Sequence, residues 1–468
     1  MNIRFKFLSI LLVFAVSARF STAQVASSPQ SVVLEDYIRE GLSGNLGLRQ
    51  QQLEVAKAVQ TLREARALFY PQFSLAPTYS LAYGGRKLQF PVGDLLNPAY
   101  AALNQLTGSD RFPTDIPNVN EQLAPHNFHD TKVSFQYAVY NPEIRYNHLI
   151  QNSLLHAEEA RLELVTSELV FAISEAYFRY LQTLQANEVL AVSHKTLAEL
   201  LRLNNRLVAN NVLTRDAVLS TEYEMAVLDQ QRVEATRNTG IAKAYFNFLL
   251  NRDFGHEIVV DTLLTGNFST APGDLDLQNL VSQAVSGRSE VKQLDQTLLA
   301  AGYAQKLQEK SALLPQVFIG GNAGFQGFGY RFAGQQYLLT QAGLKWDLFK
   351  GFERRAKIEK ARIQKDLLQI KQTETGRKIA LEVTESYQNY QAAVQGMRVA
   401  NAALEKARAY YAVVESRYRN QNVLMVELLK ARNDWESAAI QKSLTVYQLL
   451  TRQAHLRRVT GDLSYRYP

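Results

Sequence analysis

Two groups of residues have types and spacings that chemistry could use, but neither completes a site. His126 and His129, followed by Asp130, resemble a metal pair, yet structural and catalytic zinc sites need three or four ligands and no helix fixes another one nearby. The glycine-rich string from Gly321 to Gly329 imitates a nucleotide loop, but it falls late in a strand pattern with no helix start after it to hold phosphate. We interpret the histidines as surface residues and the glycines as part of a strand or hairpin. The sequence therefore predicts no enzyme, no catalytic residue, no metal and no cofactor.

The composition excludes further classes of function. The chain has 468 residues and no cysteine, so disulfides, thiolate metal sites, thiol catalysis and an acylated N-terminal cysteine as lipid anchor are not expected. The formal charge of +7 comes from 51 basic and 44 acidic residues, which are interspersed along amphipathic segments. Because there is no basic block, nucleic acid is not an expected partner.

The N-terminus predicts export. Arg4 and Lys6 precede a short apolar run over residues 7–16, and small residues at 21–23 form a cleavage site. Residues 1–23 are therefore predicted to be a signal peptide. No other run approaches the ~18 consecutive apolar residues of a transmembrane helix, so we expect any membrane insertion to use strands.

The remainder of the chain contains an internal repeat, with two halves of similar sequence pattern. Helix-ending, strand and helix-turn motifs of the first half return in the same order in the second. The matched positions are Pro71 with Pro315, Tyr140 with Phe349, Tyr177 with Tyr387, and Asn211-Val212-Leu213 with Asn422-Val423-Leu424. The first copy has extra residues between its strands, and their Pro, Gly, Asn and Asp content predicts a long extracellular loop over 84–128. Within that loop, residues 97–103 favour one short helix.

Each half is predicted to contain a strand pair followed by long coiled-coil helices. The first repeat spans 24–252, with strands near 72–83 and 131–140 and helices over 142–252. The second spans 253–468, with a segment over 253–314, strands near 316–326 and 338–349, and helices over 352–460. In the helices, apolar residues recur at alternating steps of three and four, as in coiled coils. The fold class is thus mainly α with membrane β.

The strands indicate how the chain meets a membrane. Each has about ten residues with apolar side chains on one face and small or polar ones on the other, which is typical of membrane barrels. The alternative for any single strand is the edge of a soluble sandwich. Known single-chain barrels need at least about eight strands, and open edges are not tolerated in lipid. Four strands therefore require assembly, and three copies would supply twelve.

This layout resembles the TolC-like outer-membrane efflux family over essentially the whole mature chain. The motifs that carry the resemblance are Ala312-Leu313-Leu314-Pro315-Gln316, Trp346-Asp347-Leu348-Phe349-Lys350-Gly351 and Tyr418-Arg419-Asn420-Gln421-Asn422-Val423-Leu424, each with a first-half counterpart. The resemblance implies a homotrimer with a twelve-stranded β-barrel that continues into a periplasmic α-helical barrel, around which 253–314 forms an equatorial girdle. It also implies location in the outer membrane of a Gram-negative bacterium.

The resemblance further implies where partners bind. In this family the helix-pair turns at the tunnel tip dock a periplasmic adaptor, which links the channel to an inner-membrane pump of the RND, ABC or MFS type. The corresponding residues here are Asn210, Asn211, Val212, Leu213, Thr214, Asn420, Gln421, Asn422, Val423 and Leu424. Asparagines replace the glycines that the family often has in these turns, and asparagine also tolerates positive φ.

Family members close the tip with a tyrosine and an arginine that hold an aspartate on the neighbouring coil. The tyrosine position is Tyr418 and the aspartate position is Asp216. The arginine position carries Val423, although Arg215 lies beside the aspartate. The charged half of this latch is therefore missing.

Some members also line the narrowest ring with two acids. The first of these matches Glu427, whereas the second falls on Lys430, which reverses the expected sign. Because residues three apart on a helix are neighbours, the two can pair and make the constriction less selective for cations. The alternative is that both are ordinary solvated charges.

We thus predict a passive exit duct of a tripartite efflux pump or type I secretion system, exporting small molecules or proteins. The alternative function is a periplasmic coiled-coil adaptor or scaffold. An adaptor usually shows one helical hairpin flanked by β-domains, whereas this sequence predicts two hairpins, each preceded by a strand pair. Membrane fraction and oligomer size distinguish the two.

Overall fold

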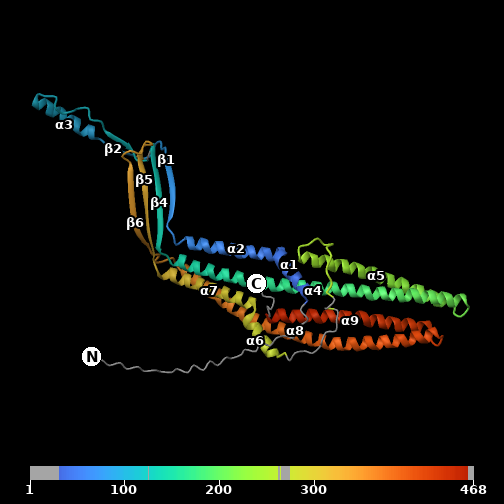
Figure 1. The fold of residues 1–468 in the computed structure, drawn as a ribbon. Helices are drawn as coiled ribbons and strands as arrows, with labels where there is room; N and C mark the ends of the chain where they lie inside the picture. The colour runs from blue at the N-terminus through green and yellow to red at the C-terminus, as the bar shows by residue number, and fades with distance from the viewer. Residues whose placement is uncertain (1–30, 125, 262–263, 265–274, 462–468) are drawn as a thin grey trace, which may run out of the picture. The chain divides into compact units, whose positions relative to one another are not determined.

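The computed structural model describes residues 31–124, 126–261, 264 and 275–461 (Figure 1). The predicted signal peptide lies outside the described residues. By its internal contacts the chain divides into two units, one of residues 1–52, 160–292 and 373–468, and one of residues 53–159 and 293–372. The first unit is helical and the second contains the strands.

The strand unit contains an antiparallel sheet in the order β1 (Gln72–Ser80), β4 (Phe128–Tyr140), β5 (Gln316–Phe328) and β6 (Gln336–Lys345). The two sequence halves therefore meet at the centre, through the β4–β5 pairing. Strand β4 begins three residues earlier than predicted, and β6 ends before Trp346. Strands β1 and β6 lie at the two edges of this sheet.

The pairing register gives the sheet two different faces. Because side chains alternate along a strand, directly opposed residues share a face. One face is mostly small and polar, with Phe318, Tyr337 and Leu339 among its large members: Gln72, Ser74, Thr78, Asp130, Lys132, Ser134, Gln136, Gly320, Asn322, Gly324 and Gln341. The other is mostly apolar: Phe73, Leu75, Pro77, Val133, Phe135, Ile319, Ala323, Leu338, Ala342 and Leu344. On the polar face, the Lys132 ammonium lies 2.6 Å from the Asp130 carboxylate, which also accepts from the Tyr337 hydroxyl at 3.0 Å.

The segment between β1 and β4 has a structure of its own. Strands β2 (Lys87–Phe90) and β3 (Val119–Gln122) pair as a two-stranded ribbon. Helix α3 (Val92–Thr107) lies between them in sequence and is more than twice as long as the helix predicted at 97–103. Figure 1 shows α3 and the ribbon beyond the end of the four-stranded sheet.

His129 is a correction to the sequence-based interpretation. It was expected at the surface, but its side chain is fully buried near the start of β4. Its Nε2 atom lies 2.8 Å from the Arg331 carbonyl oxygen and 2.7 Å from Gln335 Oε1, and Tyr330 and Phe332 pack against the ring. The β5–β6 connection folds over the imidazole, and that contact cannot be seen in the local sequence.

The helical unit contains most of two long hairpins. Helix α4 (Pro142–Ala209) is followed by α5 (Arg215–Leu249), and α8 (Glu353–Arg419) by α9 (Met425–Thr460). Shorter helices are α1 (Val32–Gly44), α2 (Leu46–Ala67), α6 (Leu277–Gly287) and α7 (Ser289–Leu313). The long helices lack interior proline, and their predicted apolar stripe is buried at Val383, Tyr390, Val394, Met397, Ala400, Val414 and Tyr418. Long paired helices with strand pairs confirm the predicted mainly helical fold class.

Tyr177 is the centre of the largest hydrophobic core. Its side chain is fully buried against Tyr37 of α1 and Phe246 of α5. Its hydroxyl donates to the Val259 carbonyl at 3.0 Å and accepts from the Asp261 amide at 2.9 Å, so it fixes the chain that follows α5. Burial raises the pKa of Tyr177 strongly, and the phenol therefore stays neutral.

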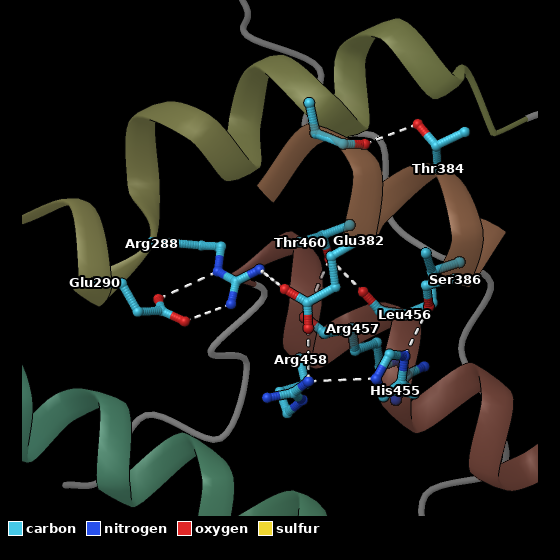
Figure 2. A network of polar contacts seen from close by, with 11 residues as sticks. Arg288, Glu290, Glu382, Thr384, Ser386, His455, Leu456, Arg457, Arg458 and Thr460 are labelled. Carbon is cyan, nitrogen blue, oxygen red and sulfur yellow. Dashed lines mark hydrogen bonds and ion pairs between the residues drawn. The ribbon is translucent and has the colours of Figure 1, made fainter. Parts of the chain in front are cut away.

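A polar network joins α8, α9 and the α6–α7 junction (Figure 2). Arg288, almost buried, pairs with Glu290 and, at 2.5 Å, with Glu382 of α8. The other Glu382 oxygen accepts from Arg458 of α9 at 2.8 Å. His455 completes the network at 2.9 Å from the Ser386 hydroxyl. The buried Arg288 guanidinium is tolerated here because it is paired with two partly exposed carboxylates.

None of the helices within the described residues has the combination of length and apolarity needed to cross a bilayer.

Candidate functional site at the helical tip

The α4–α5 turn closes with a left-handed residue. Asn211 has φ of 58°, and the Val212 amide donates to the Leu207 carbonyl at 2.8 Å. This bond from the third residue after the helix back to its last turn is the Schellman pattern, which satisfies carbonyls that a helix end leaves unpaired. Asparagine is suited to the position because its short polar side chain tolerates positive φ.

The α8–α9 turn repeats this geometry, but not in the register that the sequence suggested. The left-handed residue is Gln421, with φ of 62°, and the Asn422 amide donates to the Arg417 carbonyl at 2.9 Å. Asn211 therefore corresponds to Gln421 and not to Asn422. The backbone counterpart of Asp216 is then Val426 and not Glu427. Matching the asparagines had shifted the alignment by one residue.

Both turns send one apolar side chain into a small core at the tip. Leu213 and Val423 are half-buried against this core, which also contains four buried residues. These are Val414 and Tyr418 of α8 and Leu428 and Ala431 of α9. The outer side chains of the turns are exposed, and Leu424 is 76% and Val426 74% accessible. The tip is thus a rigid pair of turns with apolar residues on its outer surface.

Asn204 of α4 bonds to the other three helices at the tip. Its side-chain oxygen accepts from the Tyr418 hydroxyl of α8 at 2.7 Å. Its amide nitrogen donates to the Thr221 hydroxyl of α5 at 2.9 Å and lies 3.7 Å from the Met425 sulfur of α9. Asn204 is fully buried, so these bonds are made away from water. Burial raises the pKa of Tyr418, although the Asn204 contact partly opposes that shift.

A second buried polar layer lies further along the hairpins. Arg432 of α9 is 3% exposed and donates to Glu436 at 3.2 Å and to Asn433 at 2.8 Å. Glu436 also accepts from the Ser193 hydroxyl of α4. Among the described residues, no hydrogen-bond partner is found for Arg432 Nε and Nη1. Beside this layer, Tyr411 stacks on Trp435 at 5.6 Å between ring centres, and burial raises the pKa of Tyr411 to about 12.

Comparison with known proteins agrees with this geometry. A family model described as "Outer membrane efflux protein" matches residues 280–462, which include α7, the second strand pair and the α8–α9 hairpin. Over residues 280–462 the chain thus matches the family of outer membrane efflux proteins, in agreement with its resemblance to TolC-like proteins. The prediction from the motifs is thereby confirmed, and the alternative of an adaptor is not supported. Members of this family are transport proteins and not enzymes.

Solved structures extend the likeness to nearly the whole chain. The CmeC outer membrane channel of Campylobacter jejuni superposes with a TM-score of 0.76 at 14% identity, covering 98% of this chain and 94% of CmeC. The MtrE outer membrane channel of Neisseria gonorrhoeae, solved in an open state, gives 0.71 at 14% identity, covering 92% and 89%. The outer-membrane channel OprN gives 0.73 at 16% identity, covering 92% and 90%. No curated protein matches the sequence itself.

The protein is therefore an outer-membrane efflux channel of tripartite systems. The family match and the fold imply trimeric assembly within a pump of this kind. In such a channel the α4–α5 and α8–α9 turns are the features that the sequence analysis assigned to docking and gating.

The predicted gate residues are only partly brought together within one chain of the efflux channel. Tyr418 bonds to Asn204, whereas Asp216 accepts from the Thr214 hydroxyl. Asp216 is close enough to raise the pKa of Tyr418 as a lesser cause after burial, but no hydrogen bond joins these two described residues. Arg215 is exposed at the first position of α5.

The predicted constriction pair is on the first turns of α9. Glu427 is half-buried and Lys430 is exposed, with the buried Leu428 and Leu429 between them. Both residues are described by the structure, and no ion pair joins them. The expected charge neutralisation within one helix is therefore not formed in this conformation.

Sequence reasoning missed Asn204, Arg432 and Glu436. Each is a polar residue on a long amphipathic helix, and such residues are ordinarily interpreted as solvent-facing. The available signal was positional, because Asn204 falls on the buried side of α4, seven residues after the fully buried Leu197. A polar residue at a coiled-coil core position often fixes register.

Proposed function

We propose that this efflux channel is a trimeric passive duct, in which three four-stranded sheets close one twelve-stranded barrel that continues into a helical tunnel. The observation that carries the proposal is the sheet with two open edges, β1 and β6, and one apolar face. An open edge leaves N–H and C=O groups unpaired, which is not tolerated in hydrocarbon. Pairing β1 of each copy with β6 of the next removes all edges. The polar face, with Lys132 and Asp130, then lines the lumen.

The test is the mass of the protein extracted from isolated outer membranes in mild detergent, measured by light scattering and corrected for bound detergent. We expect a particle of three chains. A monomer recovered from the soluble periplasmic fraction would overturn the proposal, because four strands alone cannot close in lipid.

We propose further that the two tip turns dock a periplasmic adaptor, through which an inner-membrane pump of the RND, ABC or MFS type is engaged. Support comes from Leu424, the N-cap of α9, and Val426, the second residue of that helix, which are both apolar and exposed beside a hydrogen-bonded turn. Exposed apolar residues with a rigid backbone suit a protein interface, since little ordering entropy is lost on binding.

Leu424→Asp is expected to reduce co-purification of the adaptor at least tenfold while the trimer mass stays the same. Val413→Asp is the matched control, because Val413 is also an exposed apolar residue of the helical unit but lies outside the turns. Equal loss in both variants would argue against docking at the turns.

We also propose that Tyr418 and Asn204 hold the tip in its described conformation, and that Asp216, Arg215, Glu427 and Lys430 set its charge. The support is the buried Tyr418–Asn204 bond, which joins the two hairpins of one chain. Movement of one hairpin against the other must break this bond, so it opposes opening of the tunnel.

A further inference from the structure

Helix α3 lies in the segment between β1 and β4. One of its faces is covered by residues 112–116, which follow the helix in the chain. Asn97 exchanges two hydrogen bonds with the backbone of Ile116, at 3.0 and 2.9 Å. Asn104, seven residues later on the same face, does the same with Phe112, at 2.8 and 3.0 Å. Tyr100 packs on the Phe112 ring at 5.5 Å. The segment is therefore an ordered projection with one occupied helix face.

The opposite face of α3 carries an apolar stripe that is exposed within the chain. Its residues are Leu95, Ala99, Ala102 and Leu106, at steps of four, three and four. Leu95 is 71% and Leu106 84% exposed. This is the spacing with which helices pack on one another in coiled coils. Stripes of this kind on an ordered helix usually mark an interaction site.

We propose that α3 packs against the same helix of the other copies of this chain, so that the α3 helices form a short apolar bundle beyond the barrel. The inference rests on the trimer of the proposed function. It assigns a role to the extra residues between the strands of the first half, over 84–128, which have no counterpart in the second half of the chain.

A second copy fits the stripe better than a lipid surface does. Interfacial helices that lie on membranes carry Lys and Arg on their polar face. In α3 the only charged residue is Asp94, and the face opposite the stripe is occupied by the asparagine contacts. A short stripe of Leu and Ala with heptad spacing is complementary to itself, which is what a symmetric assembly requires.

The connection of α3 to the sheet also favours a second copy. The projection follows β1, which is an edge strand and would pair with β6 of the neighbouring copy. The start of the projection would thus lie at the seam between copies, while its end returns to the inner strand β4. Twelve strands spaced by ~4.8 Å and tilted by ~40° enclose a barrel of about 12 Å radius. A helix of 16 residues is about 24 Å long, which is enough to reach the axis from the wall.

Cysteine cross-linking tests this, since the chain has no cysteine of its own. Ala102→Cys lies on the stripe, and Ala101→Cys is the matched control, because it is also exposed and alanine but points about 100° away around the helix. In isolated outer membranes treated with a short bis-maleimide, we expect covalent dimers from Ala102→Cys at least five times as abundant as from Ala101→Cys. Dimers are expected because one thiol per chain joins two copies at most.

Adding Leu106→Lys to Ala102→Cys should abolish the cross-link, because three ammonium groups would meet in an apolar bundle. A trimeric particle in which Ala102→Cys gives no dimers, or no more than Ala101→Cys, would overturn the inference while leaving the proposed function in place. Labelling of Ala102→Cys by a lipid-phase probe in place of cross-linking would assign the stripe to the membrane. A particle that is not a trimer would overturn the proposed function first.

Discussion

Asn204 makes the buried side-chain hydrogen bonds that connect α4 with α8 and α5 at the tip. Asn204→Leu keeps the branched side-chain shape, with a somewhat larger volume, but removes the acceptor of the Tyr418 hydroxyl and the donor to Thr221. A buried polar group left unpaired costs about 1–3 kcal/mol. We expect this variant to populate the open tip more often, seen as larger or more frequent conductance steps in planar bilayers.

Asp216→Asn is the control for this experiment, because its hydrogen bond to Thr214 can be kept. It should leave the frequency of open steps at the wild-type level. If Asp216→Asn opened the channel and Asn204→Leu did not, the tyrosine–aspartate latch of the family would operate here, and the role proposed for Asn204 would be wrong.

His455 gives the helical unit a dependence on pH. Burial, with help from Arg458, lowers the pKa of His455 below its ordinary value of 6.5. Arg458 donates to Nε2 at 3.2 Å, so the neutral ring carries its hydrogen on Nδ1, toward Ser386. The unfolded chain therefore binds the proton first as the pH falls.

The sign of the effect follows from this order of protonation. The free energy of unfolding should be unaffected by His455 above pH 6.5 and should fall as the pH drops from 6.5 to the lower pKa of the folded state. His455→Gln should remove that part of the acid sensitivity, measured as the midpoint of thermal unfolding in detergent between pH 7 and pH 5. An unchanged slope in this variant would contradict the assignment.

The tip turns, as elements, are held by backbone bonds that tolerate only certain residues. Gln421 adopts the left-handed conformation at φ of 62°, which is costly for a residue with a Cβ. Gln421→Gly is expected to stabilise the α8–α9 hairpin by about 0.5–1 kcal/mol, because the strain is removed without loss of the Schellman bonds. The measurement is the thermal midpoint of the purified channel.

Asn422→Gly is the matched control, since the neighbouring residue does not have positive φ. There glycine only adds freedom to the unfolded chain, so no gain is expected. A higher thermal midpoint for Asn422→Gly and none for Gln421→Gly would support the alignment of Asn211 with Asn422 that the sequence suggested.

At this scale the sequence predicts most of the architecture, and the failures have a common cause. Strands follow from alternation and long helices from the absence of proline, which are local properties. The true length of α3 depends on Asn97 and Asn104 bonding to residues 112–116, and the burial of His129 depends on a distant hairpin. Asn204 was missed for the same reason, since its partners come from three other helices. Contacts between elements far apart in sequence leave no periodic signal.

In the whole molecule, a trimer places three copies of each tip residue around one axis, and small charges are thereby added together. Lys430 is exposed on α9 and has no ion pair with Glu427, so its positive charge is not neutralised within that helix. Lys430→Asp should shift selectivity toward cations, with Lys430→Gln intermediate. Reversal potential under a salt gradient measures the shift, which should weaken at high salt because screening shortens to a few ångströms.

The position of Lys430, and not its charge alone, is decisive in this prediction. Lys406→Asp provides the comparison, because Lys406 is a strongly exposed lysine on α8, more than one helical turn from the tip. It should leave the reversal potential unchanged. If Lys430→Asp also left it unchanged, Lys430 would not face the pore and would be an ordinary solvated charge. If both variants shifted it equally, selectivity would reflect the potential along the whole tunnel and not a ring at its tip.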